Sequence, residues 1–348
     1  TYINYTDDRG ATWKQVRPAS RLSNGEGAIV VAPGGDVLGV QWDPYSGDHL
    51  IAFKYVPGED KWWFNELPVH TPFFDREWIT VVPGPFTIDG QKVPYISFVK
   101  GAWPSKELWF YSTDGLDYTR VSSKFVDRTL RGVEEKDLQV AANDEFDWIQ
   151  PNTNGRLTPL GNGGALAGPD SPFSDEWALL DPEELRWSGF RFEGGKQPEG
   201  RFQVDSAGRL HNVIPKRAKF KYGISSNGGH TWRTISVPLP KRHVIEEVDF
   251  RANREVGVAA VAIHSHDRRS DNDRDLLYKF DIRSDTATLL RSYDVGLGDI
   301  NGASGVGASI RFDFETVAIF PDGRVAMSFY DSTTGNVPAV AIERKTKF

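Results

Sequence analysis

Short apolar runs separated by clusters of Pro, Gly, Asp and Asn recur along this chain. Residues 28–32 and 37–42 are two such runs, and Pro33, Gly34, Gly35 and Asp36 separate them. Apolar runs of this length on either side of a turn cluster are typical of two antiparallel strands joined by a tight turn. Helical periodicity is scarce, and the best helix candidate is the short segment 181–187. The pattern therefore predicts an all-β protein.

The strand–turn–strand unit occurs six times. Its turns lie near residues 35, 90, 155, 207, 253 and 322, so successive turns are 55, 65, 52, 46 and 69 residues apart. In the third unit we expect the strands at 148–149 and from Leu157 onwards. A four-stranded propeller blade needs about 40 to 50 residues plus its loops, which fits this spacing. One small sheet cannot cover both of its faces, so repeated sheets of this size are expected to stack around an axis.

A second motif, Ser/Thr-x-Asp/Asn-x-Gly-x-Thr-Trp, occurs at residues 6–13 and 225–232, with a degenerate copy at 112–119. The Asp or Asn side chain can accept N–H bonds within its own turn, the Gly can adopt positive φ, and the Trp can pack against the turn. The motif resembles the Asp-box, or bacterial neuraminidase repeat, of sialidase-like β-propellers. In that family the boxes join the third and fourth strands of blades, away from the site, so the resemblance implies a structural role for His230.

The resemblance implies a six-bladed β-propeller that forms one domain over residues 1–348. Residues 2–5 and 13–16 are predicted to be two strands of an incomplete blade, and residues 339–343 are predicted to be a third strand at the other end of the chain. Closure by strands from both termini would make six blades. The alternative is a seventh, partly absent blade, which would mean that the chain is trimmed before Thr1.

Composition narrows the function classes. The chain has 48 Asp and Glu residues against 41 Lys and Arg residues, a net charge of −7, which argues against a nucleic-acid partner. It has no Cys, which excludes disulfides and thiol nucleophiles, and no apolar run long enough to span a membrane. Its 11 Trp, 11 Tyr and 21 Phe residues suit both wedging between sheets and stacking on sugars.

Residues just before the first strand or at the end of the second strand of each unit would converge on a central funnel of a propeller. Ionisable or aromatic groups occupy these positions throughout, and their recurrence favours a functional funnel. The candidate catalytic residues are Asp75, Arg76, Arg201, Glu246, Arg311, Glu315 and Tyr330. The candidate ligand-binding residues are Trp42, Asp43, Trp148, His264 and His266.

Two enzymatic readings use these residues, and the sequence leaves open whether the protein is an enzyme. The resemblance to sialidases implies three arginines on a substrate carboxylate (Arg76, Arg201 and Arg311), with Tyr330 as nucleophile, Glu315 as its activator and Asp75 or Asp147 as acid/base. The family's Arg-Ile-Pro segment has no match in this chain. A polysaccharide lyase would instead use His264, His266 or Tyr330 as the base and Arg76 or Arg201 to neutralise a uronate.

The hypothesis that requires the fewest residues beyond those observed is a non-catalytic function. In this hypothesis the protein is an extracellular or cell-surface module that recognises a glycan or surface polymer through the funnel, with a protein partner or self-assembly as a further option. We predict no cofactor, except that Asp271, Asp273 and Asp275 have the alternation of oxygen ligands that suits calcium.

Overall fold

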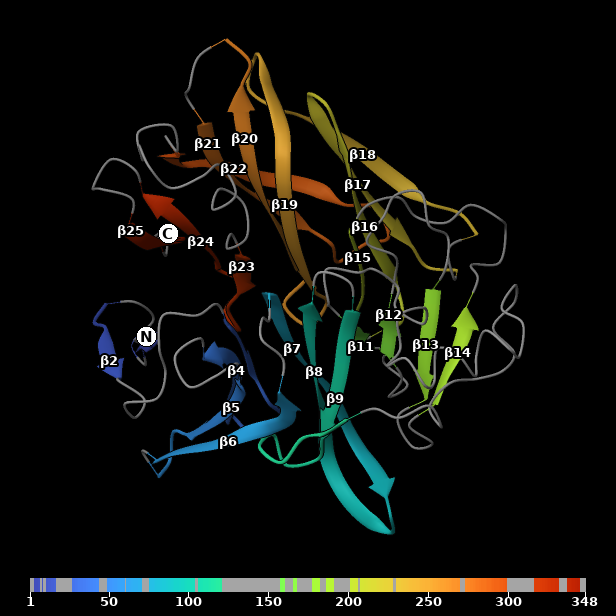
Figure 1. Ribbon diagram of the computed structural model, residues 1–348. Helices are drawn as coiled ribbons and strands as arrows, with labels where there is room; N and C mark the ends of the chain where they lie inside the picture. Colours follow the sequence, from blue (N-terminus) through green and yellow to red (C-terminus); the bar gives the residue numbers. More distant parts are fainter. Residues whose placement is uncertain are drawn as a thin grey trace. The chain divides into compact units, whose positions relative to one another are not determined.

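A computed structural model of the chain consists of β-strands β1 to β25, and the described residues include no helix (Figure 1). At several strand ends and throughout one sheet, only the backbone is described. The described residues are 3–6, 8, 11–16, 27–43, 49–59, 61–70, 75–103, 106–120, 157–159, 165–167, 177–181, 186–190, 201–205, 207–227, 230–269, 273–298, 316–331 and 337–344. The chain divides into two compact units, Thr1–Arg191 and Phe192–Phe348, and each unit is described by itself.

The first unit contains a two-stranded sheet and three four-stranded sheets. Every four-stranded sheet is an antiparallel meander in which strands adjacent in sequence are adjacent in space. The strands are β1 (Ile3–Tyr5), β2 (Lys14–Val16), β3 (Gly27–Val31), β4 (Val37–Asp43), β5 (His49–Val56), β6 (Lys61–His70), β7 (Asp75–Ile88), β8 (Gln91–Trp103), β9 (Lys106–Ser112), β10 (Thr119–Arg120), β11 (Leu157–Pro159), β12 (Ala165–Ala167), β13 (Trp177–Asp181) and β14 (Arg186–Phe190).

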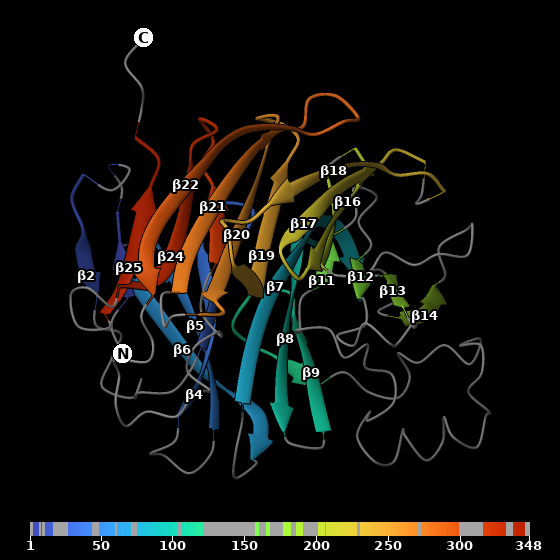
Figure 2. The ribbon, with the colours of Figure 1, turned by 90° about the horizontal axis from the view of Figure 1, so that it is seen from above.

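The second unit contains two four-stranded meanders, β15–β18 and β19–β22, and the three-stranded sheet β23–β25. Figure 2 shows these three sheets following one another within the unit. The strands are β15 (Arg201–Val204), β16 (Leu210–Lys216), β17 (Lys219–Ser225), β18 (Arg233–Pro238), β19 (His243–Asn253), β20 (Val258–Asp267), β21 (Asp273–Asp281), β22 (Thr288–Gly298), β23 (Thr316–Ile319), β24 (Val325–Asp331) and β25 (Val337–Ile342).

Five of the six predicted turns join the first and second strands of a sheet, as expected. At the turn between β7 and β8, Asp89 and Gly90 both have positive φ (51° and 78°), the backbone that a two-residue hairpin requires. The third unit differs from its prediction, because Leu157 begins the first strand of its sheet, β11, and pairs with Ala167 of β12. The connection between these strands is therefore 160–164, and residues 148–156 lie outside the described part of the chain.

The helix candidate at 181–187 is not helical at its described ends. Asp181 ends β13 and pairs with Arg186, the first residue of β14, so these ends belong to two antiparallel strands, and residues 182–185 lie outside the described part of the chain.

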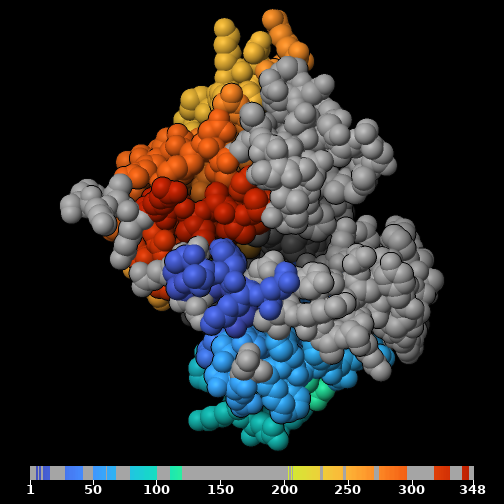
Figure 3. Space-filling model, turned by 90° about the vertical axis from the view of Figure 1, so that its left-hand side faces the viewer, coloured from blue at the N-terminus to red at the C-terminus, as the bar shows by residue number. Residues whose placement is uncertain are grey.

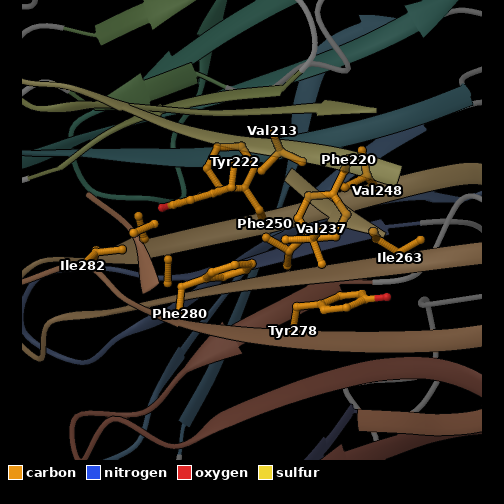
Figure 4. Close-up of a cluster of buried hydrophobic side chains, with 14 of the residues drawn as sticks. Val213, Phe220, Tyr222, Val237, Val248, Phe250, Ile263, Tyr278, Phe280 and Ile282 are labelled. Carbon is orange, nitrogen blue, oxygen red and sulfur yellow. The ribbon is translucent and has the colours of Figure 1, made fainter. Parts of the chain in front are cut away.

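The largest apolar core of the second unit lies between the β15–β18 and β19–β22 sheets (Figure 4). Tyr222 of β17 stacks on Phe280 of β21, with ring centroids 4.9 Å apart. The opposite face of β19–β22 packs on the three-stranded sheet through a second cluster that includes Ala262, Val325 and Met327. The β19–β22 sheet is therefore covered on both faces.

In the first unit, Val40 and Leu50 pack with Val99 and Phe110 between the β3–β6 and β7–β10 sheets. The β1–β2 hairpin, dark blue in Figure 3, lies on the light-blue β3–β6 sheet, and the rings of Tyr5 and Tyr55 are 6.0 Å apart. Trp13, which we expected to pack against its turn, is 48% exposed, because a two-stranded sheet offers little surface to cover it.

Candidate functional site

The strand register places the predicted site positions at one end of their sheets, where first strands begin and second strands end. Trp42 and Asp43 close β4, Asp75 and Arg76 open β7, and Arg201 opens β15. Glu246 lies in β19 at a register shift between Ile245 and Glu247, and Tyr330 is the penultimate residue of β24. For all of these residues only the backbone is described. Trp148, Arg311, Glu315, Asp147 and Asp271 lie outside the described residues.

Within the second unit, a contact between β15 and β19 shows whether the backbones of Arg201 and Glu246 lie at the same level of their sheets. The Gln203 side chain bonds both backbone groups of Ala252, at 2.7 Å to its nitrogen and 3.3 Å to its oxygen. Arg201 is two residues from Gln203, whereas Glu246 is six residues from Ala252. At about 3.3 Å per residue the two backbones therefore lie at different levels. That the candidate catalytic residues share one pocket stays a prediction.

The best-described part of this region is the end of the β19–β22 sheet. Alternate residues of β20 point to opposite faces, and Ala262 and Ile263 belong to the apolar clusters on those two faces. The next two residues, His264 and Ser265, are buried on the same two faces. We call this region the polar end; its members are His243, His264, Ser265, His266, Asp267 and Asp275.

On one face, His264 lies directly opposite Asp275 of β21, with 2.8 Å between Nδ1 and the carboxylate Oδ1. Both side chains are almost fully buried, at 1% and 2% exposed. In a neutral imidazole, a carboxylate at Nδ1 fixes the tautomer with the proton on that nitrogen, and Nε2 then carries the lone pair. His266, two residues further along β20, is half-buried.

On the other face, His243 Nδ1 lies 3.1 Å from the Ser265 hydroxyl. The hydroxyl in turn donates to the Arg274 carbonyl oxygen at 3.1 Å. A serine hydroxyl has a single proton, so in this arrangement it is committed to the backbone and His243 donates to its oxygen. The pair is therefore not an activated nucleophile, and Ser265 is fully buried.

The sequence predicted a polar strand end with His264 and His266 as ligand-binding residues, but it did not indicate His243 or the pairing of His264 with Asp275. The available signal was the alternation His-Ser-His-Asp at residues 264–267, which places one polar pair on each face of a strand. Asp275 belongs to the predicted calcium set, yet it bonds His264 inside the sheet. Among the described residues, no group of three or more His, Asp or Glu side chains is arranged to hold a metal ion.

The box-like turns lie at the opposite end of their sheets. The carboxylate of Asp114 accepts from the backbone nitrogens of Leu116 and Asp117, both at 2.8 Å. Asn227 Oδ1 accepts from the Thr231 nitrogen at 3.0 Å, and Asp8 accepts from Thr12 in the same way at 2.8 Å. The predicted self-bonding of these turns is therefore present.

A second buried polar network also lies at that opposite end. Asp205 bonds Arg209 Nε at 2.8 Å and His211 Nε2 at 3.0 Å, and His211 Nδ1 lies 2.8 Å from the Tyr222 hydroxyl. Burial would raise the pKa of Asp205, but hydrogen bonds from His211, Arg209 and the backbone hold it well below its usual range. Arg209 also donates to the Ser284 carbonyl oxygen at 3.0 Å, so this network joins two sheets and has a structural explanation.

No family model matches this chain, and no curated protein matches it. Several solved structures are similar to it at low identity. A protein assigned as a 6-phosphogluconolactonase from Bacteroides uniformis is 12% identical, with a TM-score of 0.49 over 98% of this chain and 94% of that one. The polysaccharide lyase Uly1 is 11% identical, with a TM-score of 0.43 over 86% and 85%. The NanB sialidase of Streptococcus pneumoniae is 11% identical, with a TM-score of 0.41 over 92% and 68%.

The described residues contain no helix long and apolar enough to cross a lipid bilayer.

Proposed function

We propose that this chain is a non-catalytic recognition module of the propeller type, which binds a glycan or surface polymer outside the cell. Five four-stranded meanders, with a three-stranded and a two-stranded sheet, support a six-bladed arrangement closed by strands from both termini. A seven-bladed arrangement is the alternative. The binding surface that we propose is the end of the β19–β22 sheet that carries the polar end.

The observation that carries this proposal is the polar end of the β19–β22 sheet. Both faces of β20 change there from apolar to hydrogen-bonding side chains, although burying polar groups costs free energy and adds less to stability than an apolar core. Sugar hydroxyls are recognised by oriented donors and acceptors at a surface, and His266, which is half-buried, is the member of this end that a ligand can reach. The groups most typical of catalysis, His264 and Ser265, are buried, which favours binding over turnover.

The test is binding of the full chain to an array of glycans, with two single histidine variants. We expect saturable binding that His266→Ala weakens several-fold. The matched control is His230→Ala, an exposed histidine of the box-like turn at the other end of the sheets, and this change should leave binding unaltered. A chain that binds no glycan, or that loses binding equally in both variants, would overturn the proposal.

One observation favours a glycan-active enzyme as a second candidate. The Asp275 carboxylate leaves the lone pair of His264 on Nε2, as a base that abstracts a proton in a lyase requires. The discriminating experiment follows ultraviolet absorbance of unsaturated products from uronate polymers, together with release from a sialoside reporter. Turnover that disappears in a folded His264→Gln variant would replace the binding proposal with the enzymatic one.

A further inference from the structure

Exposed cations gather on three turns beside the polar end, although the chain as a whole is acidic. The turn between β16 and β17 carries Arg217 and Lys219, residues 240–242 carry Lys241 and Arg242, and the turn after β20 carries Arg268 and Arg269. All six side chains are exposed. We call residues 216–219, 240–242 and 268–269 the basic turns.

Backbone hydrogen bonds hold the basic turns against one another. Ile245 and Leu239, on either side of 240–242, donate to the carbonyl oxygens of Arg217 and Ala218 at 3.3 and 3.1 Å. Arg268 donates to the Arg242 carbonyl oxygen at 3.4 Å. The start of β19 pairs with the end of β20, and these two strand ends lie side by side at the top of Figure 1. The cations therefore form one continuous surface of this unit.

Two arginines at the opposite end of the same sheets are neutralised locally. Arg209 and Arg283 each pair with an aspartate of their own turn, both at 2.8 Å. At the basic turns Arg242 pairs with Asp267, at 3.4 Å. Among the described residues, Arg217, Lys219, Lys241, Arg268 and Arg269 form no ion pair.

Arg242 adds an independent observation. Its φ is 75°, in the left-handed region that non-glycine residues seldom adopt and that a glycine would occupy without strain. Its side chain is 53% exposed, so packing does not explain why an arginine stands there. Strained backbone that persists on an exposed turn points to a function of the side chain.

We infer that the basic turns bind a polyanionic polysaccharide, one that bears sulfate or uronate groups. This inference rests on the proposed function and specifies that the glycan ligand is anionic. Guanidinium groups pair bidentately with carboxylates and sulfates, and adjacent turns present them in a row that a flexible chain can follow.

The same surface is less suited to other polyanions. No aromatic side chain stands on the basic turns to stack on bases, and no large apolar side chain stands there to enter a bilayer.

The test measures binding of the full chain to dextran sulfate and polygalacturonate, with uncharged dextran, duplex DNA and anionic lipid vesicles as comparisons. We expect binding to the two anionic polysaccharides that weakens as salt rises and falls more than about twentyfold in an Arg268→Glu/Arg269→Glu variant. The matched control is Arg254→Glu/Arg283→Glu, two exposed arginines at the opposite end of the same sheet, with the same change in net charge. This control should bind as the unaltered chain does.

A single substitution separates binding from a structural role. Arg242→Gly relieves the left-handed backbone but removes the ion-pair partner of Asp267, so the two effects on stability oppose each other. The unfolding midpoint should therefore change little, while the loss of the cation lowers affinity about fivefold. A lower midpoint with unaltered affinity would show a structural role and overturn the inference.

The remaining outcomes distinguish the two proposals. Binding to uncharged glycans that the charge reversal leaves unaltered would overturn this inference and keep the proposed function. Equal or tighter binding to DNA or vesicles would overturn the polysaccharide assignment. A chain that binds no glycan would overturn both.

Discussion

The Lys279 ammonium of β21 lies 2.7 Å from the Glu343 carboxylate, just beyond the end of β25. The Tyr293 hydroxyl donates to the other carboxylate oxygen at 2.7 Å, and the Val325 nitrogen lies 3.2 Å from the oxygen that Lys279 contacts. Burial would raise the pKa of Glu343, but Lys279 and Tyr293 hold it below its usual value. One side chain thus fastens the three-stranded sheet to β19–β22.

Loss of this carboxylate should destabilise the second unit. We expect Glu343→Gln to lower the free energy of unfolding by about 2 kcal/mol, because Lys279 then stays largely buried without a counter-charge. Denaturant titration measures this change. Asp294→Asn, which breaks the exposed pair of Arg274 and Asp294, is the control and should cost at most about 0.5 kcal/mol. Equal costs would show that burial does not strengthen the Glu343 pair.

The Asp205–His211 network predicts that acid weakens the fold in two ranges of pH. Burial lowers the pKa of His211 below 6.5, so below about pH 6.5 the unfolded chain takes up a proton that the folded chain does not. The lowered pKa of Asp205 contributes stability above about pH 4 that is lost as pH falls further. In both ranges stability rises with pH.

Denaturant titrations between about pH 7.5 and 5 measure the first effect. The slope of unfolding free energy against pH should be smaller in His211→Gln, which has no proton to gain at that position. His230→Gln, at an exposed turn, should keep the slope of the unaltered chain. An unchanged slope in His211→Gln would contradict the assignment.

Gly90 and Gly115 allow the steric cost of an added Cβ to be distinguished from the cost of its backbone conformation. Gly90 and Gly115 both have φ of 78°, but a Cβ on Gly115 would lie 2.5 Å from Leu38, whereas a Cβ on Gly90 would meet nothing within 4 Å. We expect Gly90→Ala to cost about 1 kcal/mol and Gly115→Ala about 2 to 4 kcal/mol. Thermal melts of both variants check this, and equal shifts would show that Leu38 moves aside freely.

The two box tryptophans should differ in their effect on stability. Trp232 is half-buried against Gly223, whereas Trp13 is 48% exposed. We expect Trp232→Ala to lower the free energy of unfolding by about 2 to 3 kcal/mol and Trp13→Ala by less than about 1 kcal/mol. The repeated motif by itself suggests that both tryptophans are core residues and that both substitutions cost the same free energy. Unequal losses would contradict that expectation. Equilibrium unfolding of the two variants decides between them.

Local pattern was enough to predict most turns and strands. At Asp89-Gly90 and Pro321-Asp322-Gly323 the turn residues and flanking apolar runs agree, and the hairpins form as expected. Prediction failed between 148 and 190, where two turn clusters compete. Asn154-Gly155 and Gly161-Asn162-Gly163-Gly164 are both good turn sequences, and only strand pairing shows that the second joins β11 to β12.

The sequence predicted where along the strands the candidate site residues lie. It did not predict which side chains they contact. His264 and His266 were found because they follow an apolar run. The partners of these residues come from two other strands, at His243 of β19 and Asp275 of β21, and their pairing depends on register.

The sequence alone determined the all-β class, the repeated hairpins and the self-bonded turns, because these depend on residues within a few positions of one another. Tertiary structure decided which polar side chains meet, that His264 is buried against Asp275, and that cations from three separate turns form one surface. The physical reason is that a strand specifies its own alternation of faces, whereas the neighbour across each face is chosen by register and sheet packing over long separations in sequence.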